Sequence, residues 1–510
     1  MGTAERDRST IDVGYRAGMT RVETVDAARV APDRRDHWRT DALVLAIATV
    51  VIRIPAFFAE RSLVFDDGVF ASSARAMRNG ELPFRDIFSS QGPVFLPLVW
   101  VADLVGLRTL DAPRLLAVGA GVLLTIAVYS CARHVTTRGN AFLAAGLVTT
   151  SGSVLWVTVP VNADGPSLAL SVLAVAFALR HRDHPRLRTA VWMGLAAGGA
   201  VSIKALCVPA LVIAGLVVLL SGQHTKAGLR TGVRDAAVSA GIAVAVYVVT
   251  ALPFGIADVW EQSYTYHQDA RRAASHSGAF RKLLDTLWDR DKLVLVALAL
   301  AAIAWGVRFV VRRRADGSGD GAMAIVVAFL VLWAVMVVAL LVWEPALWRA
   351  HVSHLVPPLA LLAALKPPSW KVLVVAGVVT VPFAIATNTS ILWPDGYTGQ
   401  QAALVHHLES FAADAQFISD DPGLVWRSGH DTPGDFADTS YQRLDDGSIN
   451  RASLVRAASA RDVCGVIVTS PQHFGRLGGL PDVLAAHDYH PVQFGEGTTL
   501  YERDTPFCTD

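Results

Sequence analysis

The sequence carries little charge for its length. Asp, Glu, Lys and Arg make up 17% of its 510 residues, whereas a soluble protein usually carries about a quarter. The formal net charge is +1. No basic cluster is interleaved with aromatic residues, so the electrostatic footprint of a nucleic-acid-binding protein is missing. Hydrophobic residues reach 53% and gather in runs of the roughly 20 residues that a bilayer span needs. The composition therefore predicts a polytopic membrane protein.

The N-terminal tail shows no export signal, and the sequence has only four cysteines. Residues 1–39 form a polar tail with balanced acids and bases, and this tail lacks the apolar core of a cleavable signal peptide. We expect the tail to lie in the cytoplasm. Cys131 and Cys207 fall in apolar runs, which is typical of packing residues. Cys464 and Cys508 lie in the polar C-terminal region, and an extracytoplasmic location would allow them to form a disulfide.

The region from 390 to 510 lacks a phosphate-binding glycine loop and the spacing of zinc ligands, which argues against a separate catalytic centre there. Its apolar spacing indicates helices at 400–413 and 451–461. Short β-rich runs at 464–468 and 498–501 indicate strands. We therefore expect a small extracytoplasmic α/β domain after the transmembrane region, residues 40–389.

Eleven apolar runs predict eleven membrane spans. Connections rich in Lys and Arg, such as 180–188 and 226–234, alternate with connections such as 161–165 that have neither. Positively charged loops tend to stay in the cytoplasm, so the basic connections are placed there. The predicted spans are 40–58, 113–132, 139–160, 165–181, 187–203, 206–221, 234–254, 293–311, 321–343, 351–366 and 369–388.

One further apolar run, residues 92–107, is short for a span and contains a proline and an aspartate. If it crossed the bilayer, residues 60–112 and the Asp164 loop would face opposite sides. We therefore expect an interfacial or re-entrant segment. The resulting topology is a multi-pass protein of the cell membrane with a cytoplasmic N-terminus. It places residues 60–112, the Asp164 loop and the region 390–510 on the extracytoplasmic side.

Two adjacent aspartates, Asp66 and Asp67, follow the first span. Ionisable residues at a membrane are costly and usually functional. One of the two could cap a short helix at 68–79, since Asp is a favoured N-cap. Capping needs only one carboxylate, however. The functional alternative is that one aspartate accepts a proton from an incoming hydroxyl while the other orients it or binds a cation.

Four more polar residues lie on the same predicted side. Arg85 and Asp86 either pair with each other or bind substrate. Asp164 is either an ordinary turn residue or part of the site. Lys204, at the end of an apolar run, either extends to the membrane interface or holds a lipid-linked phosphate.

A third cluster, Arg349, His351 and His354, lies at the extracytoplasmic start of the span 351–366. The two histidines are three residues apart and share one face of a helix. No third metal ligand is evident in the sequence, so binding of a phosphate by basic residues is favoured over a metal site. The sequence does not identify a metal.

The order of these motifs resembles the GT-C superfamily of polytopic glycosyltransferases. The resemblance is strongest to the branch that contains protein O-mannosyltransferases and the lipid A aminoarabinose transferase, and it covers the membrane portion. The matching residues are Phe65-Asp66-Asp67-Gly68, Pro83-Phe84-Arg85-Asp86, Gln91-Gly92-Pro93, Asn162-Ala163-Asp164, Lys204, and Arg349 to His354.

The resemblance implies an inverting transfer of a sugar from a polyprenyl-phosphate donor to a glycan, lipid or protein acceptor outside the cytoplasm. Asp66 or Asp67 would be the general base. Lys204 and Arg349 would stabilise the leaving phosphate. Relatives differ in their need for a divalent cation, so a cation is a possible cofactor. Relatives often have Asp-Glu where this chain has Asp-Asp, which leaves the identity of the base open.

The alternative is a non-enzymatic transporter or lipid flippase. Such a protein would favour polar residues or broken helices near the bilayer midplane, in matching halves of the chain. Here the polar groups gather at one predicted face, and no internal repeat is apparent. This distribution favours the transferase.

Overall fold

The computed structural model describes residues 37–57, 64–221, 226–273, 278–313, 321–344, 347–503 and 505–508. Leu63 and most of the predicted N-terminal tail lie outside these ranges. The chain forms a unit of residues 1–41 and a second unit of residues 42–510. All of the site described below lies in the second unit.

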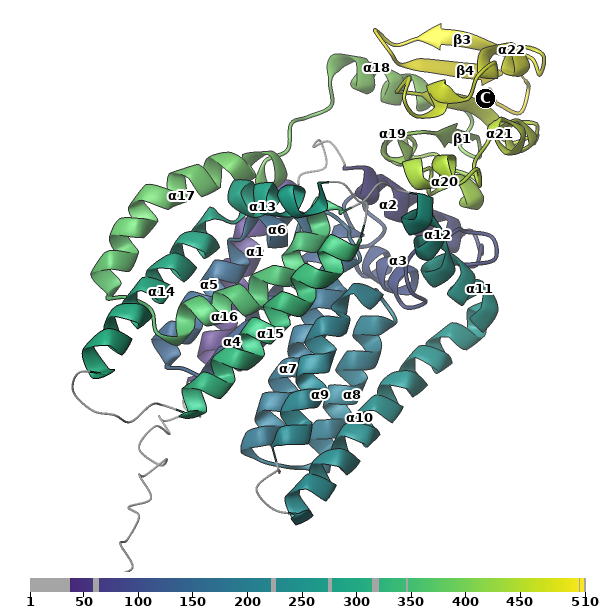
Figure 1. Cartoon of the computed structure of the whole chain (residues 1–510). Helices are drawn as coiled ribbons and strands as arrows, with labels where there is room; N and C mark the ends of the chain where they lie inside the picture. Colours follow the sequence, from purple (N-terminus) through teal and green to yellow (C-terminus); the bar gives the residue numbers. More distant parts are fainter. Residues whose placement is uncertain are drawn as a thin grey trace, which may run out of the picture. The chain divides into compact units, whose positions relative to one another are not determined.

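The described residues between 37 and 392 are mostly helical (Figure 1). The helices are α1 (Trp38–Arg53), α2 (Phe65–Arg78), α3 (Phe95–Val105), α4 (Arg114–Arg133), α5 (Arg138–Thr149), α6 (Gly152–Thr158), α7 (Asp164–Asp183), α8 (Leu187–Val201), α9 (Val208–Leu220), α10 (Lys226–Ala251), α11 (Ile256–Trp260), α12 (Tyr266–Ala273), α13 (Ala279–Arg290), α14 (Lys292–Arg313), α15 (Gly321–Trp343), α16 (Val356–Leu365) and α17 (Trp370–Leu392). A 3-10 helix, Arg349–Leu355, precedes α16.

Five helices among the described residues are long and apolar enough to cross a membrane. They contain Trp38–Phe57, Arg114–Arg133, Gly228–Phe254, Met323–Trp343 and Trp370–Leu392. The remaining predicted spans correspond to α5 with α6 and to α7, α8, α9, α14 and α16. The number of eleven crossings therefore stays a prediction.

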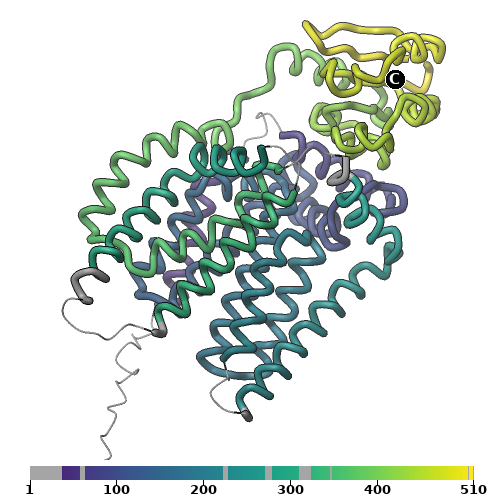
Figure 2. Tube along the Cα trace, in the orientation of Figure 1, coloured from purple at the N-terminus to yellow at the C-terminus, as the bar shows by residue number. Residues whose placement is uncertain are grey.

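Small residues let the membrane helices pack closely. Helices α7, α8, α9 and α10 lie side by side (Figures 1 and 2). A Cβ at Gly194 of α8 would lie 2.6 Å from the Ser239 carbonyl oxygen of α10, and one at Gly198 would lie 2.7 Å from the Val246 side chain. Close approach at small residues is how helices associate in a bilayer, where no hydrophobic force drives them together.

Helix α3 explains the apolar run 92–107. It has 11 residues, so it is about 16 Å long, roughly half of the 30 Å hydrocarbon core. Helix α3 alone is too short to span a bilayer. Its length agrees with the expectation that this run is not a full crossing, which stays a prediction.

The run 139–160, predicted as one span, forms two helices bent by 65°. The break lies at Ser151, whose hydroxyl caps α6 by accepting from the Val154 N–H. Asp291 in turn accepts hydrogen bonds from the hydroxyls of Ser151 and Ser153, at 2.5 Å each. These polar partners satisfy the backbone and side-chain groups that a break exposes.

The C-terminal domain, residues 399–508, contains a four-stranded sheet in the order β1-β2-β4-β3. Strands β1 and β2 are parallel, and the other two pairings are antiparallel. The elements are α18 (Gly399–Leu408), β1 (Gln416–Ser419), α19 (Pro422–Arg427), α20 (Tyr441–Asp445), α21 (Arg451–Ala458), β2 (Val463–Val468), α22 (Leu480–Ala485), β3 (Tyr489–Gln493) and β4 (Thr499–Arg503). Both predicted helices and both predicted strands are present. Strands β1 and β3 were not predicted.

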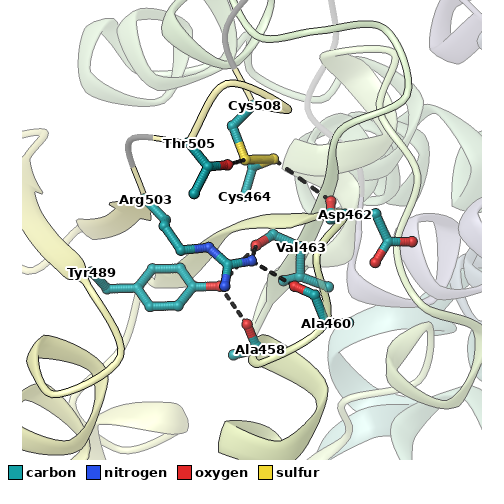
Figure 3. Close-up of a disulfide and its surroundings, with 9 residues drawn as sticks. All are labelled: Ala458, Ala460, Asp462, Val463, Cys464, Tyr489, Arg503, Thr505 and Cys508. Atoms are coloured by element: carbon teal, nitrogen blue, oxygen red, sulfur yellow. Dashed lines mark hydrogen bonds between the residues drawn. A yellow bond between two sulfur atoms is a disulfide. The ribbon is translucent and has the colours of Figure 1, made fainter.

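Cys464 and Cys508 form a disulfide, with their Cα atoms 5.5 Å apart (Figure 3). The bond ties β2 to the end of the chain. Beside it, the Arg503 guanidinium donates to the carbonyl oxygens of Ala460 and Val463. The predicted disulfide is confirmed. Cys131 and Cys207 are buried free thiols.

Candidate functional site

Asp66 and Asp67 lie in the first turn of α2. The N-cap of this helix is Val64, which makes no side-chain capping bond. The proposal that one of the aspartates is the N-cap is therefore wrong. Carboxylates in a first turn are still favourable, because the helix dipole is positive there. Both side chains are free to contact other parts of the chain.

Asp67 is fully enclosed. Its side chain is 2% exposed, and its Oδ2 atom accepts a hydrogen bond from Nη2 of Arg114, at 2.8 Å. Its Oδ1 atom accepts one from the Val161 backbone N–H, at 2.6 Å. Both carboxylate oxygens thus have charged or backbone donors. This geometry leaves Asp67 no oxygen for a substrate.

Asp66 is only half-buried, and its Oδ2 atom accepts a hydrogen bond from Nδ2 of Asn162, at 2.8 Å. Its Oδ1 atom has no donor among the described residues. Burial raises the pKa of Asp66 to about 6, and the charges of Asp164 and Asp438 act in the same direction, whereas Lys204 and Asn162 oppose them. A carboxylate that titrates here is suited to accept a proton near neutral pH.

Asn162 connects Asp66 to a second acid. While its amide nitrogen donates to Asp66, its Oδ1 atom accepts from the backbone N–H of Asp164, at 2.8 Å. Asp164, the first residue of α7, is 1% exposed and accepts from Nζ of Lys204, at 2.8 Å. The predicted residues Asp66, Asp164 and Lys204 therefore form one connected group.

The histidines join this group from the 3-10 helix before α16. Nζ of Lys204 lies 3.0 Å from Nε2 of His351, and Nδ1 of His351 lies 2.8 Å from a carboxylate oxygen of Glu344. An ammonium can only donate, so Nε2 of His351 accepts and Nδ1 carries the proton toward Glu344. His354 approaches the other oxygen of Asp164, at 3.3 Å.

The Gln91-Gly92-Pro93 motif supports the backbone beside Lys204. The N–H of Gly92 donates to the Ile203 carbonyl oxygen at 2.9 Å, and that of Val94 donates to Ser202 at 3.0 Å. A Cβ at Gly92 would lie 2.4 Å from the Ser202 oxygen, so only glycine fits this close approach. The motif thus fixes the position of the backbone that leads into Lys204.

His267, from α12, lies against the same motif and donates from Nε2 to the Ser90 carbonyl oxygen, at 2.8 Å. Burial is the main cause that lowers its pKa to about 4, and the charge of Lys204 acts in the same direction. His267 is therefore neutral at physiological pH and adds an uncharged imidazole to the edge of the group.

Three predicted residues are not brought into the group. Arg85 and Asp86 form an ion pair of 2.7 Å with side chains that are 66% and 34% exposed, and Asp86 also accepts from the Leu82 N–H. This is the pairing foreseen as the alternative to substrate binding. Arg349 is exposed and makes no hydrogen bond or ion pair with a described residue.

Within the described ranges, no group of three or more His, Cys, Asp or Glu side chains is arranged to hold a metal ion. The ammonium of Lys204 lies between Asp164 and His351. A positive charge already bonded to both groups repels a metal ion, so these residues do not fit one. The possible divalent cation remains an untested prediction.

Known proteins share this architecture. The structure matches ArnT from Cupriavidus metallidurans bound to undecaprenyl phosphate with a TM-score of 0.60 and 14% identity, covering 92% of this chain and 99% of ArnT. Apo ArnT gives a TM-score of 0.60 and 14% identity over 91% of this chain and 98% of ArnT. The archaeal oligosaccharyltransferase AglB from Archaeoglobus fulgidus, in complex with an inhibitory peptide and a dolichol-phosphate, gives 0.52 and 13%, covering 92% and 75%.

This chain has the GT-C fold. In sequence, residues 90–253 match the family described as dolichyl-phosphate-mannose-protein mannosyltransferase. No curated protein sequence matches the chain. The matched segment contains Asp164 and Lys204. Asp66 lies before its first residue, and His351 lies after its last. The predicted resemblance to GT-C proteins is confirmed, and the fold brings the matched and unmatched parts of the site together.

Sequence reasoning missed two members of this candidate site. Glu344 follows the 23 apolar residues of α15, and an acid directly after so apolar a run was a signal that could have been used. Arg114, which begins α4, gave no such signal. Its partner Asp67 is 47 positions away, and only the folded chain shows that they meet.

Proposed function

We propose that this chain is a glycosyltransferase that moves a sugar from a polyprenyl-phosphate donor to an extracytoplasmic acceptor, with inversion at the anomeric carbon. One observation carries the proposal. Asp66, with a raised pKa and a carboxylate oxygen that no described residue occupies, is connected through Asn162 to the Asp164–Lys204 ion pair. The GT-C fold, shared with a protein solved with undecaprenyl phosphate, gives independent support.

Asp66 is the proposed general base. Its Oδ1 atom accepts the proton of the acceptor hydroxyl while the acceptor oxygen attacks the anomeric carbon. The bond from that carbon to the phosphate oxygen breaks, and its electron pair leaves with the polyprenyl phosphate. A single displacement of this kind inverts the anomeric centre. Asp67 takes no part in it, because both of its oxygens are engaged.

Lys204 is the proposed phosphate ligand. An ammonium has three hydrogens, and two of them point to Asp164 and His351. The third can bond a phosphate oxygen and stabilise the charge that develops as the phosphate leaves. Arg349 is exposed at the start of the turn that carries His351, which makes it the proposed second cation for the phosphate.

The proposed topology places the site and the C-terminal domain outside the cytoplasm. The variant S448C puts a thiol at an exposed position of that domain, and R186C puts one in an exposed basic connection. The native free thiols are buried, so they give little background. In intact cells an impermeant maleimide should label S448C only, and R186C only after permeabilisation. The reverse pattern would contradict the topology.

The transfer itself can be tested with purified protein in nanodiscs. Polyprenyl-phosphate-linked mannose, glucose and arabinose would be offered together with membranes as the source of acceptor. Release of polyprenyl phosphate by the wild type, and its loss in Asp66→Asn, is the expected result. Failure of the wild type both to bind undecaprenyl phosphate and to release it from any donor would overturn the proposal.

A further inference from the structure

We infer that the C-terminal domain is a working part of the catalytic site. Arg427, in α19 of that domain, acts as a positioning residue that holds Asp66 in place through Asp111, Arg114 and Asp67. The inference rests on the proposed function of Asp66. It concerns residues that contact no substrate and that the mechanism above does not use.

The four groups form a buried chain of alternating charge. Nη2 of Arg427 lies 2.9 Å from Oδ1 of Asp111, and the same oxygen lies 3.3 Å from Nη1 of Arg114. Nη2 of Arg114 then reaches Oδ2 of Asp67, at 2.8 Å. None of these side chains is more than 9% exposed. Charges this well buried are weakly screened by water and salt.

The charge balance depends on Arg427. Among the described residues, the guanidinium groups of Arg427 and Arg114 pair with the carboxylates of Asp111 and Asp67. Without Arg427, these two carboxylates would compete for the guanidinium of Arg114, and each would weaken the ion pair of the other. Breaking a buried ionic network by removing one partner is costly for this reason, because a buried charge is left uncompensated.

Asp67 restricts the position of Asp66 in two ways. The two residues are neighbours in the first turn of α2, so a shift of one moves the other. In addition, Oδ1 of Asp67 accepts from the N–H of Val161 at 2.6 Å, and the next residue, Asn162, donates to Asp66 at 2.8 Å. Asp67 therefore fixes both the base and the side chain that orients the base.

Close packing of α19 against α2 supports the same connection. A Cβ at Gly68 would lie 2.3 Å from the backbone nitrogen of Gly423, so the two backbones are in direct contact beside Asp67. The indole N–H of Trp426 donates to the Leu110 carbonyl oxygen at 3.0 Å. Arg75 of α2 lies over the Trp426 ring, 4.5 Å from its centroid. The domain is thus seated on the helix that carries the base.

The test replaces Arg427 by Met and compares the result with Arg476→Met. Arg476 is in the same domain, but its ion pair with Asp445 is 35% and 63% exposed. Coupling through such networks is typically worth about 2- to 30-fold. We expect R427M to lower kcat by about tenfold while the donor KM stays within about twofold. R427K should recover part of the loss, and R476M should match the wild type.

Hydrogen exchange supplies a readout that needs no transfer activity. In R427M, amide exchange should rise in residues 65–78 and 161–164, far along the chain from the substitution, and R476M should leave both segments unchanged. If the wild type proves inactive, the proposed function fails, yet exchange still decides whether the coupling exists. Unchanged exchange in 65–78, or raised exchange with an unchanged kcat in an active enzyme, would overturn the inference.

A second pair of variants guards against a failure of R427M to fold. Gly68→Ala inserts a methyl group where the α19 backbone lies, without changing any charge. Gly119→Ala is the matched control, since nothing lies within 4 Å of a Cβ at that position of α4. G68A should reproduce the rise in exchange and the fall in kcat. If G68A behaves like G119A in both measurements, the domain contact does not position Asp66.

Discussion

Asp66 and Asp67 are neighbours in the chain, yet they lie in two different kinds of surroundings. The region around Asp67 is closed, with the Arg114 ion pair on one carboxylate oxygen and the Val161 backbone donor on the other. The region around Asp66 is half-open, and one neutral amide is its only described hydrogen-bond donor. The comparison teaches that adjacent carboxylates can divide the work, with one holding the structure and its neighbour left reactive at the cost of an unfavourable, partly buried charge.

The largest expected effect is on transfer activity, through the half-buried Asp66. Changing Asp66 to Asn removes the proposed general base, and transfer should fall by about 10²- to 10⁴-fold with little change in melting temperature. The matched control is Asp86→Asn, which alters a partly exposed aspartate paired with Arg85 and should keep nearly full activity. Equal loss in both variants would mean that Asp66 has no special role.

Breaking the buried ion pair of Asp67 should instead lower the stability of the fold. Arg114→Met leaves Asp67 and Asp111 buried without their shared guanidinium, and breaking a buried pair this way costs about 3–5 kcal/mol. Thermal unfolding in detergent should show a large drop in melting temperature. The exposed pair of Arg281 and Asp285 gives the control, because R281M should change stability by less than about 0.5 kcal/mol. An R114M variant as stable as the wild type would contradict the structural role given to Asp67.

Lys204 should show an intermediate effect. Lys204→Met removes the ammonium hydrogen proposed for the phosphate, and a charged hydrogen bond is worth about 1.5–3 kcal/mol, which is about 10- to 100-fold in affinity. Binding of undecaprenyl phosphate can be measured by calorimetry in nanodiscs. Lys282→Met, in α13 at an exposed position, should bind as the wild type does. Unchanged affinity in K204M would place the phosphate elsewhere.

The smallest effect is on pH dependence. Because burial raises the pKa of Asp66 to about 6, the proposed base is progressively protonated below that pH, and kcat/KM should approach a tenfold fall per pH unit. The raised pKa also means that ionisation of Asp66 opposes folding. Wild-type stability should therefore gain from this group as pH falls through 6 toward the ordinary value of about 3.9. Asp66→Asn should lack both effects, which a pH series of rates and melting temperatures would reveal.

Local patterns predicted much of the fold. The short apolar run became α3, the β-rich runs became β2 and β4, and Cys464 pairs with Cys508. Each of these follows from length, periodicity or location. Strands β1 and β3 escaped detection because β1 has only four residues and β3 contains Pro491, so neither has a strong local pattern.

The site was predictable only in part, for a different reason. Asp66, Asp164 and Lys204 are polar residues in apolar surroundings, so each was conspicuous on its own in the sequence. Arg114 and Arg427 are ordinary charged residues in the sequence, and their importance lies in what they meet. Arg427 lies 316 positions from Asp111. No local pattern encodes a contact of that range.

That separation has a consequence for how the chain is made. Synthesis proceeds from the N-terminus, and contacts between distant residues form late in folding. The acids of α2 are made early, whereas Arg427 emerges after all the membrane helices. The disulfide closes later still, because Cys508 follows Arg427 in the chain. The proposed base therefore gains the support of Arg427 only when the C-terminal domain has folded, so a half-made chain can insert its helices before the candidate site is complete.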